Sequence, residues 1–109
     1  MAIYDINSRI FDNEVIDYKE TVVVDFWAPW CAPCRVMADN IVRLDKEMEG
    51  SVKICKVNID DDEKEKKPLA DRFEVYSIPT LLVFKNGELK KRIVGLRTTA
   101  GIREMIMNL

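Results

Sequence analysis

The sequence predicts an α/β domain, with a central mixed five-stranded sheet flanked by four helices. Two β-branched runs in the first half are joined by a segment of helical periodicity, which implies parallel pairing. Near the C-terminus, two apolar runs flank the tetrapeptide KNGE at 85–88, a hairpin signal that implies an antiparallel end to the sheet. The length of 109 residues fits a single domain over 1–109.

The N-terminal quarter predicts two strands and the helix between them. Residues 3–6 indicate a short edge strand, and residues 7–18 a helix that one of its first two side chains can cap. The run TVVVDF at 21–26 is apolar on both faces, as a buried parallel strand is, and only Asp25 interrupts it.

The middle of the chain predicts a long helix, a strand and a short helix. From Cys31 to Glu49 the apolar period is helical, and Gly50 marks a plausible end. One stripe of this helix carries Met37, Ile41, Leu44 and Met48. The run SVKICKVNI at 51–59 predicts a strand, and 60–73 an acidic turn leading into a helix whose mixed charges form a solvated face.

The C-terminal third predicts the hairpin and a last helix. Strands are expected at 80–84 and 89–94, since Asn-Gly between them supplies the positive φ values of a tight turn. Thr98 can cap a helix that carries Ile102, Met105, Ile106 and Leu109.

Charge and composition exclude several classes of function. There are 17 basic and 19 acidic side chains and no strongly basic stretch, which argues against a nucleic-acid partner. No apolar run is long enough to cross a bilayer, and the charged first residues do not resemble a signal peptide, so we expect no membrane association and a cytoplasmic location. Histidine is absent, which removes Cys–His and Ser–His catalytic pairs and imidazole metal sites.

The segment FWAPWCAPC at 26–34 carries the strongest chemical signal. Cys31 stands where a strand gives way to a helix, and the free N–H groups and dipole of a helix start favour its thiolate. Cys34 lies one turn on, so the pair can close and reopen a small disulfide, with an exposed Cys31 attacking first. Trp27 and Trp30 could supply an apolar surface around it.

Two other interpretations of the cysteine pair stay open at this point. A structural disulfide is one, although so small a ring restricts the unfolded chain little. A metal site is the other, although the chain has three cysteines and no histidine. A redox dithiol is favoured over both.

Four motifs together resemble the thioredoxin family over nearly the whole chain: VVVDFWAPWCAPC (22–34), KVNID (56–60), SIPTLLVFKNGE (77–88) and VG (94–95). The resemblance implies the thioredoxin fold and a general protein disulfide reductase, which passes two electrons to substrate disulfides through a mixed disulfide. It implies a redox disulfide between Cys31 and Cys34, protein disulfides as substrates and a flavin-dependent thioredoxin reductase as electron donor. It also implies a monomer that holds no cofactor or metal.

The resemblance assigns catalytic roles to four residues. Cys31 matches the nucleophile, Cys34 the resolving cysteine, and Asp25 a buried aspartate that moves a proton to or from the resolving thiol. A carboxylate in an apolar strand should have a raised pKa, which suits this role. The alternative is a structural Asp25 that only accepts a capping hydrogen bond or forms an ion pair. Lys56 matches a lysine near the aspartate, or is a plain surface lysine.

The resemblance also assigns a substrate-docking surface. Pro79 matches a cis-proline facing the disulfide, which presents the backbone of Ile78 to an extended substrate, with a trans proline as the alternative. Gly95 matches a glycine that lets a substrate approach closely. The remaining members of the surface are Trp27, Trp30, Ala32 and Pro33.

Two residues depart from the family pattern, and a third cysteine lies outside the pair. Ala32 replaces the glycine usual between the two cysteines, which should preserve the helix but can shift the redox potential. Tyr76 replaces the usual basic or small residue before the cis-proline and could alter which partners dock. Cys55 lies in a predicted strand and is expected to be a small buried hydrophobe, with regulatory oxidation as the alternative.

Two competing functions remain open. A thiol oxidase or isomerase would use the same cysteine pair at a more oxidising potential. A binding module would keep the fold and leave the dithiol chemistry incidental. Replacing both cysteines by serine separates the binding module from the enzyme.

Overall fold

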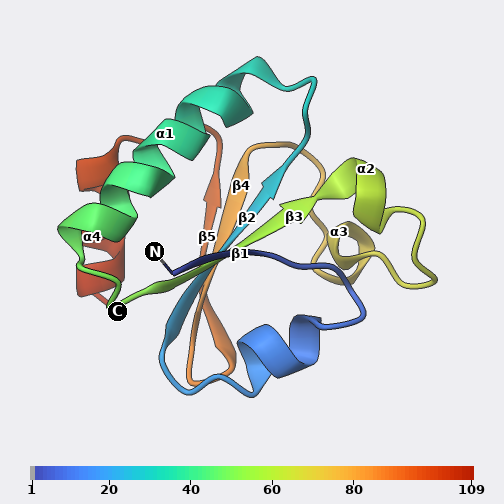
Figure 1. The fold of residues 1–109 in the computed structure, drawn as a ribbon, viewed down its shortest axis with the longest axis horizontal. Helices are drawn as coiled ribbons and strands as arrows, with labels where there is room; N and C mark the ends of the chain where they lie inside the picture. Colours follow the sequence, from blue (N-terminus) through green and yellow to red (C-terminus); the bar gives the residue numbers. More distant parts are fainter. Residues whose placement is uncertain (1) are drawn as a thin grey trace.

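Figure 1 shows the computed structural model, which describes residues 2–109. Its sheet has the strand order β1-β3-β2-β4-β5. At its centre β2 (Thr21–Trp27) pairs parallel with β3 (Lys53–Asn58) and antiparallel with β4 (Thr80–Lys85). At the edges β1 (Ile3–Asp5) lies parallel to β3, and β5 (Glu88–Val94) antiparallel to β4. The predicted mixed five-stranded sheet is confirmed.

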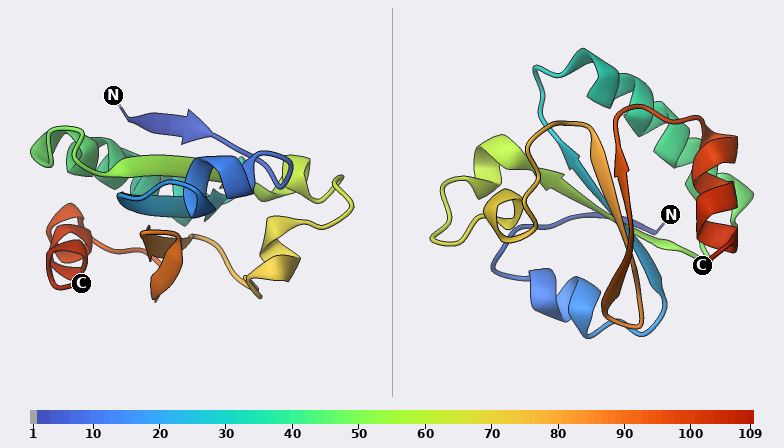
Figure 2. Two further views of the ribbon diagram at one scale, coloured as in Figure 1. Left: turned by 90° about the horizontal axis from the view of Figure 1, so that it is seen from below. Right: turned by 180° about the vertical axis from the view of Figure 1, so that it is seen from behind.

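Helices cover both faces of this sheet. On one face α1 (Ala32–Glu47) and α4 (Thr99–Met107) lie side by side (Figures 1 and 2). The other face is covered by the π-helical turn η1 (Asp12–Ile16) and by two one-turn helices, α2 (Ile59–Asp62) and α3 (Leu69–Arg72). Within residues 2–109 no helix has the length and apolar character needed to cross a bilayer.

The two faces of the sheet carry two separate hydrophobic cores, and β2 contributes to both. Val22 and Val24 pack with Phe11 in the core under η1 and α3, whereas Val23 packs with Met37 in the core under α1 and α4. Successive side chains of a strand point to opposite faces. The unbroken apolar run that predicted a buried strand is therefore explained by a helical layer on each side.

The N-terminal helix predicted over 7–18 is largely wrong. Helical structure there is the five-residue turn η1, and residues 8–10 form a turn in which Asn7 Oδ1 accepts a hydrogen bond from the N–H of Arg9 at 3.0 Å. A side-chain acceptor at this position competes with helix formation. Phe11 and Val15 are buried, so packing rather than helical propensity shapes the segment.

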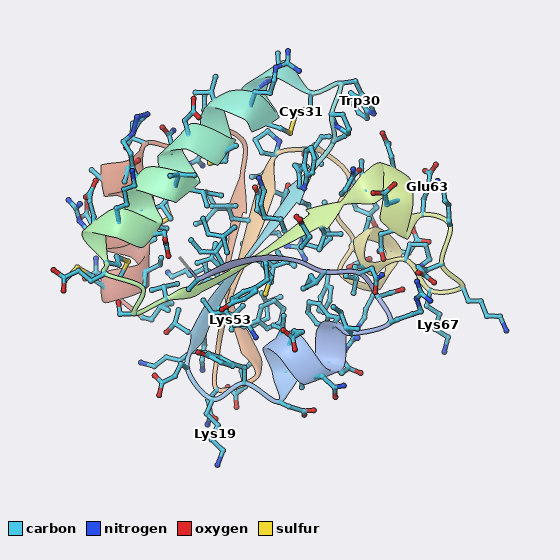
Figure 3. All side chains as sticks on the ribbon, viewed as in Figure 1. Lys19, Trp30, Cys31, Lys53, Glu63 and Lys67 are labelled. Carbon is cyan, nitrogen blue, oxygen red and sulfur yellow. A yellow bond between two sulfur atoms is a disulfide. The ribbon has the colours of Figure 1, made fainter. Side chains whose placement is uncertain are left out.

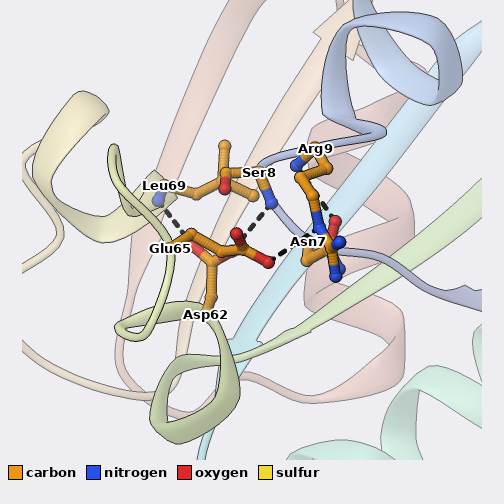
Figure 4. Close-up of polar contacts among 6 residues, drawn as sticks. All are labelled: Asn7, Ser8, Arg9, Asp62, Glu65 and Leu69. Atoms are coloured by element: carbon orange, nitrogen blue, oxygen red, sulfur yellow. Dashed lines mark hydrogen bonds and ion pairs between the residues drawn. The ribbon is translucent and has the colours of Figure 1, made fainter.

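The charged run at 60–73 also differs from the prediction, because one of its acids is buried. Asp62 is 2% exposed, and its carboxylate accepts the N–H of Ser8 at 2.7 Å and the N–H of Leu69 at 2.6 Å (Figure 4). It joins the chain before η1 to the start of α3, which has no side-chain cap of its own. Buried backbone N–H groups need such an acceptor, so Asp62 does not belong to a solvated face.

Most of the predicted helix ends and turns are confirmed. Thr98 Oγ1 accepts the N–H of Gly101 at 3.0 Å at the start of α4. After α1, Gly50 has a φ of 70°. Asn86 and Gly87, with φ values of 53° and 78°, make the tight turn between β4 and β5.

The substitution Gly87→Ala is expected to destabilise the fold by about 2 kcal/mol or more. A Cβ at this position would run into the carbonyl oxygen of Ile16, and φ is positive as well. Gly50→Ala is the matched control, since its φ is positive but no atom lies within 4 Å of the added Cβ. Urea unfolding should show a clearly larger loss for Gly87→Ala, and equal midpoints for the two variants would contradict this account.

Candidate redox site

Cys31 is the N-cap of α1, as the sequence predicts, and it follows the loop that leaves the carboxyl end of β2. Its backbone is extended, and its Sγ accepts the N–H of Cys34 at 3.2 Å. Ala32 and Pro33 form the exposed first turn, where the missing N–H of proline leaves no hydrogen bond unmade. In Figure 3, Cys31 and Trp30 lie at the end of the molecule opposite to Lys19.

Cys31 and Cys34 are joined by a disulfide, with their Cα atoms 5.2 Å apart. Cys31 is 5% exposed and Cys34 2%, so the expectation of an exposed Cys31 is wrong for this oxidised form. Trp27, Ile59 and Ile78 pack against the pair and cover it. Cys31 nevertheless retains the larger exposed fraction of the two.

Asp25 and Lys56 are brought together by strand register, and Lys56 lies near Trp27, which packs against the cysteine pair. They are directly paired residues of β2 and β3, and Lys56 Nζ lies 3.9 Å from Asp25 Oδ2. Asp25 is fully buried, and neither of its carboxylate oxygens has a hydrogen-bond partner. Burial raises the pKa of Asp25 to about 6, although the positive charge of Lys56 acts to lower it. A carboxyl group with such a pKa can exchange a proton near neutral pH.

The Ile78–Pro79 peptide bond is cis, and this segment faces the disulfide. Cys31 Sγ lies 3.9 Å from the carbonyl oxygen of Ile78. The carbonyl oxygen of Pro79 accepts the N–H of Gly95 at 2.9 Å, and Gly95 has a φ of 90°, which only glycine adopts readily. The structure thus places Ile78 against Cys31 and Gly95 against the adjacent Pro79.

The two tryptophans have different environments. Trp30 is 66% exposed, and its Nε1 donates to both carboxylate oxygens of Asp60, at 3.2 and 3.0 Å. Trp27 is half-buried, and the ammonium of Lys56 lies 5.0 Å from its ring centroid. Trp30 therefore contributes to the outer surface of the site, and Trp27 to the layer beneath it.

Sequence reasoning missed two polar residues that support the site. Asp60 orients Trp30, and the fully buried Thr80 donates from Oγ1 to the carbonyl oxygen of Ser77 at 2.7 Å, next to Pro79. Neither stands out in the sequence, because an aspartate after a strand and a threonine at the start of one are common in any fold.

Cys55 packs in a different hydrophobic cluster from the redox pair. It is the third cysteine, unpaired and fully buried in β3 within the core under η1. Burial raises the pKa of its thiol to about 11, so it stays protonated at physiological pH. The prediction of a small buried hydrophobe is confirmed.

Comparison with known proteins supports these observations. A sequence model of the family described as Thioredoxin matches residues 2–108. Thioredoxin from Rickettsia bellii is 39% identical over 103 residues, which cover 94% of each chain. Thioredoxin 1 from Nostoc sp. is 40% identical over 90 residues, covering 83% of this chain and 80% of the relative.

Plant proteins are also among the relatives. Thioredoxin M5, chloroplastic, from Oryza sativa subsp. japonica is 46% identical over 89 residues, which cover 82% of this chain. This chain spans about half the length of that relative, 49% of it, and nearly the whole of the Rickettsia relative.

Proposed function

This chain belongs to the thioredoxin family of protein disulfide oxidoreductases, and on that premise we propose that it acts as a general reductant of protein disulfides. The single observation that carries the proposal is the Cys31–Cys34 pair at the first turn of α1. The helix start stabilises a thiolate at Cys31, and its partner sulfur is within bonding distance.

The proposed reaction is two successive thiol–disulfide exchanges. The thiolate of reduced Cys31 attacks one sulfur of a substrate disulfide, forms a mixed disulfide and releases the other substrate sulfur as a thiolate. The thiolate of Cys34 then attacks Cys31 Sγ, which breaks the mixed disulfide and frees the second substrate thiolate. The substrate gains two electrons and, after protonation, two protons, and the protein is left with the Cys31–Cys34 disulfide.

Asp25 is proposed to take the proton from Cys34 in the second exchange. Lys56 is proposed to adjust the pKa of the Asp25 carboxylate through its positive charge. The support is the burial of Asp25, its pKa of about 6 and the 3.9 Å separation from Lys56 Nζ. Raising the proton affinity of a carboxylate near a thiol makes it a better base toward that thiol.

The proposed docking surface surrounds Cys31. A substrate strand would pair with the backbone at Ile78, beside Pro79, and pass close to Gly95. Trp30 contributes an exposed aromatic face to this surface, and the half-buried Trp27 packs against the cysteine pair. Ala32 and Pro33 complete the surface at the start of α1.

The proposed partners are disulfide-containing proteins and a flavin-dependent thioredoxin reductase that restores the dithiol. We propose that residues 1–109 work as one domain and as a monomer, without a bound cofactor or metal. The cytoplasm is the proposed location, because repeated reduction of substrates requires a compartment that resupplies electrons.

Reduction of insulin disulfides by the prereduced, folded protein tests the proposal. Turnover is expected once a thioredoxin reductase and its electron source are added. The midpoint potential should fall in the range typical of thioredoxins, about −270 mV. Failure to reduce insulin would reject the reductase, and a potential well above that range would favour a thiol oxidase or isomerase instead.

A further inference from the structure

A groove of about 320 Å³ opens directly beside the redox disulfide. Ile59 and Ile78 line it, and the same two side chains pack against Cys31 and Cys34. A substrate whose cystine lies at Cys31 can therefore place a neighbouring side chain in this groove.

The groove has aromatic walls formed by Trp30 and Tyr76. Both are strongly exposed, with 66% of Trp30 and 87% of Tyr76 accessible. The rest of the lining is mostly aliphatic, including Ile59 and Val75. An aliphatic stem can be buried between such walls, and a cation can lie over either ring.

Each aromatic wall carries a carboxylate at its polar edge. Trp30 Nε1 donates to Asp60, and the hydroxyl of Tyr76 donates to Glu74 Oε1 at 3.3 Å. The negative charge of Glu74 raises the pKa of the Tyr76 hydroxyl above its usual value, with a smaller contribution from Asp71. The rim of the groove is therefore acidic.

Cations also lie close to this rim, and Arg35 is one of them, since its guanidinium donates to the carbonyl oxygen of Pro29, next to Trp30, at 3.0 Å. Arg92 acts to lower the pKa of Tyr76, but its guanidinium donates to the main-chain carbonyl oxygens of Phe73 at 2.5 Å and Glu74 at 3.3 Å. Against Arg35 and Arg92 stand the three carboxylates of Asp60, Glu74 and Asp71. The balance of charge around the two aromatic rings is negative.

We propose that this groove selects disulfide substrates that carry an arginine or lysine next to the reacting cysteine. The stem of that side chain lies between Trp30 and Tyr76, and its cationic end is directed to the carboxylates of Asp60 and Glu74 at the rim. Tyr76 is the specificity-determining residue, because it supplies one wall and holds Glu74 at its edge. The inference rests on the proposed disulfide reductase function.

Three disulfide peptides that differ only at the residue beside the cysteine test the selection: arginine, norleucine or glutamate. The second-order rate constant for reduction by prereduced protein is measured at low ionic strength. The arginine peptide is expected to react about tenfold faster than the glutamate peptide, from combined stacking and charge attraction. High salt should reduce this preference, because exposed charges are screened.

Two variants locate the source of the preference. In the double variant Asp60→Asn, Glu74→Gln the arginine-over-glutamate ratio should fall to about threefold or less, since the aromatic walls remain. In Tyr76→Ser the arginine-over-norleucine ratio should fall below the wild-type ratio but stay above one, because Trp30 and both carboxylates remain. Glu20→Gln is the control: it removes one exposed acid just before β2, at the end of that strand remote from Cys31, and should keep the wild-type ratio.

The outcomes separate this inference from the function on which it rests. A neutral small disulfide, bis(2-hydroxyethyl) disulfide, reports the exchange chemistry alone. If it and all peptides go unreduced, the reductase function fails, and the selection with it. If it is reduced but the three peptides react equally, or if Glu20→Gln lowers the ratio as much as the double variant does, only the cationic selection is overturned.

Discussion

Cys31→Ser is expected to lower insulin reduction to the uncatalysed background, and Cys34→Ser to stop after a single exchange. Cys31 has the larger exposed fraction of the pair and caps α1, so it is the sulfur that a substrate disulfide can reach. Serine at 31 is not an effective nucleophile toward sulfur at neutral pH. Serine at 34 leaves the first attack intact but removes the group that resolves the mixed disulfide.

The two variants are distinguished by mass spectrometry of the products after reaction with a disulfide protein. Cys34→Ser should accumulate one covalent adduct per molecule, sensitive to dithiothreitol, and Cys31→Ser none. Cys55→Ala is the control, because Cys55 is buried away from the site and should not be needed for turnover. Multiple turnovers by Cys34→Ser, or wild-type rates from Cys31→Ser, would overturn the assignment of the two sulfurs.

Asp25→Asn is expected to stabilise the oxidised protein at neutral pH, by an amount that grows between about pH 4 and pH 6. Burial raises the pKa of Asp25 to about 6 from the ordinary value of 3.8 that it has in the unfolded chain. The folded state therefore holds this proton more tightly, and the wild type loses stability as pH rises through that interval. The loss amounts to about 3 kcal/mol by pH 7.

Asparagine carries no ionisable proton, so this pH-dependent loss is absent from the variant. Urea unfolding of both oxidised proteins at pH 4, 5, 6, 7 and 8 measures the difference. The difference in unfolding free energy should increase up to about pH 6 and then level off. Because asparagine also changes buried hydrogen bonding by a constant amount, the slope with pH is the test rather than the value at one pH.

Lys56→Met supplies the matched comparison. The charge of Lys56 acts to lower the pKa of Asp25, so its removal should raise that pKa further. The pH at which the difference in unfolding free energy levels off should then lie above pH 6. Parallel stability curves for the wild type and Asp25→Asn would show that Asp25 does not titrate in this interval. In the reduction assay, Asp25→Asn should slow resolution of the mixed disulfide without preventing its formation.

Local signals in the sequence were sufficient for most elements and for the position of the cysteine pair. Asn86-Gly87 predicted a tight turn because its backbone favours positive φ, and Thr98 predicted a helix start because its hydroxyl reaches a free N–H. Cys31 was placed at a helix start by the change from strand to helical periodicity within a few residues. Such signals act over one or two turns of chain, so the sequence alone expresses them.

The site residues on β2 and β3 illustrate the limit of this reasoning. Asp25 could be predicted to be buried with a raised pKa, because it interrupts an apolar strand. Its approach to Lys56, 31 positions along the chain, depends on the parallel register of β2 and β3, which no local pattern encodes. In this chain the resemblance to a family supplied that pairing in advance.

The sequence by itself determined the order of the strands, the two-sided burial of β2 and the place of the cysteine pair at the start of α1. Only the tertiary structure decided that Asp62 is buried between Ser8 and Leu69, that residues 7–18 do not form a regular helix, and that Trp30 and Tyr76 share one groove. The physical reason is common to all three. The burial of a polar side chain or the wall of a groove depends on segments far apart in the chain, and their meeting is set by packing rather than by neighbouring residues.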